Sequence, residues 1–69
     1  MKYCLVGVDG NAFAVMGYVV RAMKEVGYCK QEIDDYLTRA KSSDYDNLLC
    51  ESMAMIDKCN ERAGDCEED

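Results

Sequence analysis

Residues 3 to 26 read YCLVGVDGNAFAVMGYVVRAMKEV, and this stretch decides how the chain is expected to fold. Its first part, from Tyr3 to Val8, is apolar and rich in residues that favour strands. It is followed by Asp9-Gly10-Asn11, a sequence typical of tight turns. Because successive side chains of the run are apolar, both faces of a strand would need cover. The sequence therefore predicts a short β-strand that turns into a helix.

The helix after this turn is predicted from Ala12 to Val26. Asp9 or Asn11 can cap the free amides at its start, and Gly27 can adopt the left-handed conformation that ends a helix. Apolar side chains occupy two adjoining faces, with Phe13, Met16, Val20 and Met23 on one and Val15, Val19, Ala22 and Val26 on the other. So wide an apolar arc indicates burial on more than one side.

Two further helices are expected. One runs from Lys30 to Lys41, with acids in its first turns, where the helix dipole favours them. The other begins at Ser43, whose hydroxyl together with the carboxylate of Asp46 resembles a capping box. Their apolar side chains at helical spacing are Ile33, Tyr36, Leu37 and Ala40 in the first and Leu48, Leu49, Met53 and Ile56 in the second.

The apolar pattern stops after Asp57, and the end of the chain is rich in acids. We therefore expect one compact domain over residues 1–58 and a flexible acidic tail over residues 59–69. The predicted fold is mainly α: a small three-helix domain preceded by one short N-terminal β-strand, in the order β-α-α-α.

The predicted strand needs a partner, because a single strand cannot make a sheet. The candidates are a stretch around Met55 to Cys59 and the same strand of a second copy of the chain. Pairing about a two-fold axis would satisfy the exposed backbone edge and cover apolar surface that one small chain cannot. We therefore predict a homodimer formed through residues Tyr3 to Val8.

The charge of the chain limits the class of partner. Its formal net charge is −6, and a protein with this charge and no basic patch is a poor candidate for binding DNA, RNA or an anionic membrane surface. No apolar run approaches the roughly 20 residues of a membrane span. We therefore expect the partner to be a protein or a small molecule, and neither nucleic acid nor membrane.

The five cysteines favour a reducing compartment. Their number is odd, and Cys4 and Cys50 lie within apolar patterns where a reduced thiol acts as a small hydrophobe. This predicts a cytoplasmic protein. The chain has no histidine and no C-x-x-C pair, which disfavours a metal site. No nucleophile stands beside an evident base, so we predict a non-enzyme with no catalytic residues, metal or cofactor.

Some residues are candidates for contact with a partner, although solvated surface and helix capping would explain each of them as well. Tyr18 and Arg21 share one polar stripe of the first helix, and both residue types are enriched at interaction hot spots. The Gly10 turn, followed by helix amides, weakly resembles a phosphate site, which leaves a homodimeric small-molecule or nucleotide binder open as the alternative. The candidate partner-binding residues are Asp9, Asn11, Tyr18, Arg21, Asp44, Tyr45 and Asp46.

Two motifs carry a resemblance to a family. They are Val6-Gly7-Val8-Asp9-Gly10-Asn11-Ala12-Phe13 and Ser43-Asp44-Tyr45-Asp46-Asn47-Leu48-Leu49. The chain resembles, over roughly residues 5 to 56, a family of small uncharacterised proteins found in bacteria, phages and mobile elements. The resemblance implies an accessory protein and carries over no biochemical activity. We therefore expect a protein that binds a host or phage protein, for example as an inhibitor of a host defence system such as an anti-CRISPR.

Overall fold

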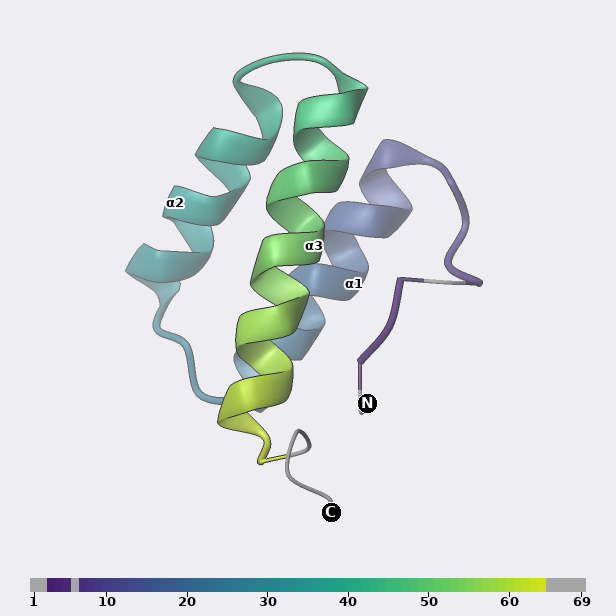
Figure 1. Cartoon of the computed structure of the whole chain (residues 1–69). Helices are drawn as coiled ribbons and strands as arrows, with labels where there is room; N and C mark the ends of the chain where they lie inside the picture. The colour runs from purple at the N-terminus through teal and green to yellow at the C-terminus, as the bar shows by residue number, and fades with distance from the viewer. Residues whose placement is uncertain (1–2, 6, 65–69) are drawn as a thin grey trace.

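The computed structural model describes residues 3–5 and 7–64, which contain three helices. These are α1 (Ala12–Glu25), α2 (Lys30–Lys41) and α3 (Tyr45–Arg62). The central helix in Figure 1 is α3, which packs against both α1 and α2. The N-terminal segment runs beside this bundle and reaches α1 at the same end as the loop between α2 and α3. The prediction of a mainly helical, three-helix fold is confirmed.

The prediction of an N-terminal strand is wrong for the residues that the structure describes, and Val6 lies outside them. Instead of continuing straight, the segment makes a turn in which the Val8 N–H donates to the Leu5 carbonyl oxygen at 3.1 Å. Gly7 has a φ of 91° in this turn. A side chain would strain that conformation, whereas glycine adopts it freely. The apolar run therefore ends in a turn that no regular strand contains.

Side chains of the helices take the place of the expected partner strand. The Asn60 side chain accepts a hydrogen bond from the Tyr3 N–H at 2.8 Å and donates one to the Tyr3 carbonyl oxygen at 3.0 Å. The Tyr18 hydroxyl accepts from the Cys4 N–H at 2.9 Å. These backbone groups are satisfied within one chain, so they no longer argue for pairing with a second copy. The homodimer through residues Tyr3 to Val8 stays a prediction, without this support.

The predicted start and stop of the first helix are confirmed. The Asn11 side chain caps α1 by accepting from the Phe13 N–H at 2.8 Å. At the other end, Gly27 has a φ of 92°, and the Tyr28 N–H donates to the Met23 carbonyl oxygen at 2.9 Å. A glycine in this conformation with such a bond is a common helix stop.

The third helix starts two residues later than expected. Asp44, and not Ser43, is its N-cap, and the Asp44 carboxylate accepts from the Asn47 N–H at 3.0 Å. The predicted capping box is therefore wrong in its residues, although the position of the helix is nearly right. A carboxylate performs the same role because it also satisfies a free amide and complements the helix dipole.

The same helix continues beyond the expected limit of the compact domain at residue 58. It extends to Arg62, and both Cys59 and Asn60 are buried. The stretch from Met55 to Cys59, which was one candidate for a second strand, is part of this helix. The remaining tail residues, 65–69, lie outside the described residues.

The core lies between α3 and the other two helices. Its largest fully buried side chains include Val19 and Met23 of α1 and Tyr36 of α2. The hydroxyl oxygens of Tyr36 and Ser52 are 2.6 Å apart, which joins α2 to α3 by a buried hydrogen bond. Met53, predicted on the buried face of the third helix, is instead 54% exposed.

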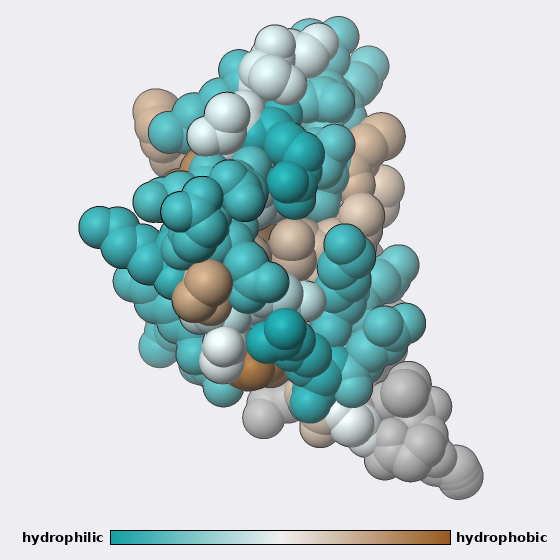
Figure 2. Space-filling model, turned by 90° about the vertical axis from the view of Figure 1, so that its left-hand side faces the viewer, coloured by the Kyte–Doolittle hydropathy of each residue, from teal (hydrophilic) through white to brown (hydrophobic). Residues whose placement is uncertain are grey.

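The outer surface of α2 is mostly hydrophilic. Figure 2 shows this side of the molecule, where hydrophobic residues appear only in small areas at the margins and between hydrophilic residues. Among the described residues no helix has the length and apolar character needed to cross a bilayer. The cysteines in the described part of the chain, Cys4, Cys29, Cys50 and Cys59, are free thiols.

Candidate functional site

Phe13, in the first turn of α1, is the most exposed of the large apolar side chains described, with 81% of its surface accessible. Tyr45, in the first turn of α3, is 41% exposed. Both line a groove of about 410 Å³ at the end of the molecule where α1 and α3 begin and α2 ends. This surface is named the Phe13 groove. It is lined by Ala12, Phe13, Met16, Ala40, Lys41, Ser43, Asp44, Tyr45 and Leu48.

The turn before α1 is fixed against the start of α3. The Tyr45 hydroxyl donates a hydrogen bond to the Gly10 carbonyl oxygen. Within the turn, the Asn11 N–H donates to the Asp9 carboxylate at 3.1 Å. The bond from Tyr45 therefore places the candidate residues of the turn next to the candidate residues at the start of α3, although they are far apart in the sequence.

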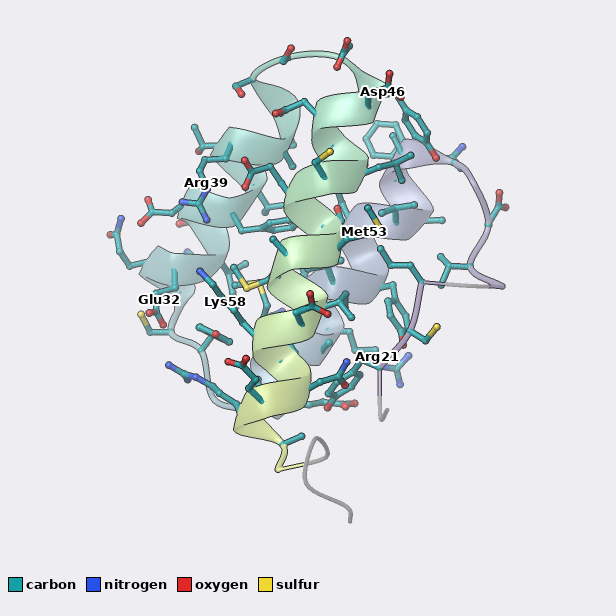
Figure 3. All side chains as sticks on the ribbon, viewed as in Figure 1. Arg21, Glu32, Arg39, Asp46, Met53 and Lys58 are labelled. Carbon is teal, nitrogen blue, oxygen red and sulfur yellow. The ribbon has the colours of Figure 1, made fainter. Side chains whose placement is uncertain are left out.

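Five of the seven candidate residues consequently lie at one end of the molecule. Asp44 lines the Phe13 groove, whose lining also includes the basic residue Lys41. Asp46 is exposed in the first turn of α3, at the upper end of the view in Figure 3. The candidates that the fold brings together are Asp9, Asn11, Asp44, Tyr45 and Asp46.

Tyr18 and Arg21 lie elsewhere and belong to a different surface. The Tyr18 hydroxyl holds the Cys4 N–H, which gives this residue a structural role. Arg21 is largely exposed, and its Nε atom is 3.9 Å from the Glu25 carboxylate. Both line a second cavity of about 330 Å³. Figure 3 shows Arg21 near the lower end of the molecule and Asp46 at the upper end.

Tyr3 also lines this second cavity, and its surroundings fix its protonation. Its hydroxyl donates to the Glu25 carboxylate at 2.8 Å. This hydrogen bond, together with burial, raises the pKa of Tyr3 to about 12. The neutral hydroxyl thus remains a donor across the ordinary pH range. Tyr3 ties the N-terminal segment to the end of α1, so this part of the cavity wall is formed by a structural contact.

The basic residues between α2 and α3 are largely engaged with other side chains. Arg39 and Lys58 lie on this side of the molecule in Figure 3. The Arg39 Nε atom is 3.3 Å from the Glu51 carboxylate. The Arg62 guanidinium lies 3.7 Å from the centre of the Tyr28 ring, a cation–π contact. An anionic ligand here would have to compete with these contacts.

The start of α1 is poorly suited to an anionic ligand. The Asn11 side chain already caps the helix, and the Asp9 carboxylate accepts a hydrogen bond from the turn. A phosphate placed here would meet the negative charge of Asp9. Within residues 3–5 and 7–64, no three His, Cys, Asp or Glu side chains are grouped as metal ligands would be. The residues at the start of α1 are thus occupied with capping the helix and closing the turn.

Sequence reasoning did not identify Phe13 as a binding residue. Its helical position matches that of Met16 and Val20, so it was assigned to the apolar face. It lies in the first turn, beyond the part of α1 that the other helices cover. The available signal was the width of the apolar arc, which exceeds what one small core can bury. Nothing in the sequence indicates that the polar residues Ser52 and Asn60 are buried.

The chain was compared with family models, curated proteins and solved structures. No family model matches it, and neither a curated protein nor a solved structure matches it.

Proposed function

We propose that the protein is a non-catalytic accessory factor that acts by binding another protein, and that the Phe13 groove is the contact site. The exposure of Phe13 is the observation that carries this proposal. Full burial of a side chain of this kind contributes about 1.5–3 kcal/mol of favourable free energy. The isolated chain does not gain this contribution, whereas a complex that buries Phe13 would. A concave, largely apolar groove with a few polar residues is a common form of binding site.

Tyr45 supports the same assignment. Aromatic residues are enriched among the few residues that dominate binding energy. The hydrogen bond from the Tyr45 hydroxyl to Gly10 holds the exposed ring in place before a partner arrives. A side chain that is already ordered loses less conformational entropy on binding. Phe13 and Tyr45 thus form a pair of apolar anchors at the rim of one groove.

A narrower role follows from the family resemblance alone. In that role the bound protein belongs to a host defence system, and the chain is an inhibitor such as an anti-CRISPR. Protein binding through the Phe13 groove is compatible with this role and with other accessory roles. Identification of the captured partner distinguishes between them.

The test is affinity capture from a lysate of the native host with three forms of the full chain. These are the unaltered protein, Phe13→Ser and Met53→Ser. Met53 is a matched control because it is also an exposed apolar residue on a helix, but does not line the Phe13 groove. Circular dichroism spectra verify that all three forms are folded.

We expect the unaltered protein and Met53→Ser to retain the same host protein and Phe13→Ser to lose it. Removing one well-buried aromatic anchor typically weakens binding by at least about 2 kcal/mol, or roughly thirtyfold. Equal capture by all three forms would show that the Phe13 groove is not the contact site.

A further inference from the structure

We propose that the Phe13 groove is one end of a longer groove between α1 and α2, and that this groove binds an acidic amphipathic helix of a partner protein. The inference rests on the proposed function and adds the class of partner. Three features of the described residues support it: the continuity of the groove, an exposed glycine in its wall, and the lysines beside it.

Another cavity of about 410 Å³, distinct from the one lined by Tyr18 and Arg21, lies between α1 and α2 and is lined by these helices and the loop joining them; it is named the α1–α2 cavity. On each of the two helices, the residues of this cavity lie on the same face as residues that line the Phe13 groove, because side chains three or four positions apart share one face of a helix. Each such row of residues is called a stripe. The stripe on α1 comprises Phe13, Met16, Val20 and Lys24, and the stripe on α2 comprises Lys30, Ile33, Leu37 and Lys41. The two cavities share no lining residue, but their residues follow one another along the same faces of α1 and α2, and from this we infer that they are successive sections of one groove.

Gly17 lies on the same side of α1, four residues after Phe13 and three before Val20. It is exposed, and a Cβ atom added there would have no heavy atom within 4 Å. Glycine is unfavourable in the interior of a helix. Here it leaves room for another helix to approach the backbone of α1 closely.

Lysines flank the groove along its length. Lys24 and Lys30 line the α1–α2 cavity, and Lys41 lines the Phe13 groove. None of the three has an ion-pair partner among residues 3–5 and 7–64. The acids that line the groove are Asp34 and Asp44. The groove thus carries an excess of positive charge on a chain whose net charge is −6. Carboxylates beside the apolar face of a partner would pair with these lysines.

The shape of the groove favours a helix as its occupant. From Phe13 to Lys24 the α1 stripe spans about 17 Å, the length of roughly three helical turns. Grooves between packed helices commonly receive the apolar face of an amphipathic helix. A helix placed here would cover a side of α1 and α2 that α3 leaves open, as the fourth helix does in a four-helix bundle.

The test uses three labelled synthetic peptides of about 14 residues, each long enough for four helical turns. The first carries leucines on one helical face and glutamates elsewhere. The second has lysines in place of the glutamates. The third is a scrambled acidic peptide in which the leucines no longer share a face. Each is titrated with the full-length protein, and binding is followed by fluorescence anisotropy.

We expect the acidic amphipathic peptide to bind at least about tenfold more tightly than the other two, the size of effect that two or three exposed ion pairs can give. The double substitution Lys24→Glu and Lys41→Glu should remove this preference. Lys58→Glu, on the side where α2 and α3 meet, is the matched control and should leave it unchanged. Gly17→Leu should weaken binding without lowering the thermal midpoint, because a Cβ atom at this exposed position has no heavy atom within 4 Å and leucine favours a helix more than glycine does.

Equal or tighter binding of the basic or scrambled peptide would overturn the inference, as would the absence of saturable binding by the acidic amphipathic peptide. If sedimentation showed a dimer that Gly17→Leu dissociates, the occupant would be a second copy of the chain. Should the peptide preference fail while host capture still depends on Phe13, only the partner class is wrong. Capture that does not depend on Phe13 would overturn the proposed function itself.

Discussion

The side-chain amide of Asn60 forms two hydrogen bonds with the backbone of Tyr3, accepting from its N–H at 2.8 Å and donating to its carbonyl oxygen at 3.0 Å. Asn60 is buried, so both bonds are shielded from water. An asparagine amide has the same donor and acceptor as a peptide group. Asn60 therefore does for the N-terminal segment what a neighbouring strand would do.

Replacement of Asn60 by alanine should lower the free energy of unfolding by about 1–3 kcal/mol, because buried backbone groups of Tyr3 lose their partners. Asn47→Ala is the matched control. Its side chain donates a single hydrogen bond, to the Arg39 carbonyl oxygen at 2.9 Å, at a more exposed position. Chemical denaturation measures both variants. Similar losses for Asn60 and Asn47 would contradict the role assigned to the buried pair.

Tyr36 and Ser52 should behave as a coupled pair. Tyr36→Phe or Ser52→Ala alone leaves one buried hydroxyl without its 2.6 Å partner, and each should cost about 1–3 kcal/mol of stability. The double variant removes both hydroxyls and should lose clearly less than the sum of the single losses. Urea unfolding of the four forms gives the coupling energy, and additive losses would show that the hydroxyls do not stabilise one another.

Stability should fall at alkaline pH in a way that depends on Tyr3. Its pKa is raised from 10.0 to about 12 by the hydrogen bond to Glu25 and by burial, so the folded chain binds this proton more tightly than the unfolded chain. The contribution is fully present below pH 10 and is lost as the pH rises towards 12. The measurement is the pH dependence of unfolding for the unaltered protein and Tyr3→Phe. Parallel curves above pH 10 would refute the prediction.

The free thiols should differ in reactivity. Burial raises the pKa of the Cys59 thiol, and the nearby Arg62 offsets part of this effect. Cys29 and Cys50 are exposed. During a short pulse of iodoacetamide on the folded protein, Cys59 should be alkylated more than about tenfold more slowly than either of them. Peptide mass spectrometry measures the extent at each site, and the difference should vanish in denaturant. Equal rates in the folded protein would show that Cys59 is accessible.

Helices were the part of the fold that could be predicted well, because their signals are local. The bounds of α2, Lys30–Lys41, agree with the expectation, and Asn11 and Gly27 mark the ends of α1 as their chemistry indicates. The strand was predicted wrongly because the composition of an apolar segment does not reveal what pairs with its backbone. That partner, Asn60, lies 57 residues away and would be read from sequence as a polar residue of the tail.

Only part of the candidate site could be predicted, because local signals mark helix starts but do not reveal contacts between distant segments. Asp44 and Asn11 are recognisable as helix starts, and such positions gather wherever helices begin at one end of a bundle. That the hydroxyl of Tyr45 would reach Gly10 depends on tertiary packing. The exposure of Phe13 depends equally on which neighbours cover the first turn of α1. Periodicity assigns a residue to a face of its helix, but it does not show how much of that face the neighbouring helices bury.

The Phe13 groove lies at the opposite end of α1 from Tyr3 and Asn60, about 20 Å away along a helix of 14 residues. In Figure 1 the end of α3 lies at the lower side of the bundle, where Asn60 holds Tyr3, remote from the loop between α2 and α3. A label on an exposed side chain in the last turn of α3 would therefore stand at the far end of the bundle from Phe13, and it should report on the stability of the Tyr3 contact without covering Phe13.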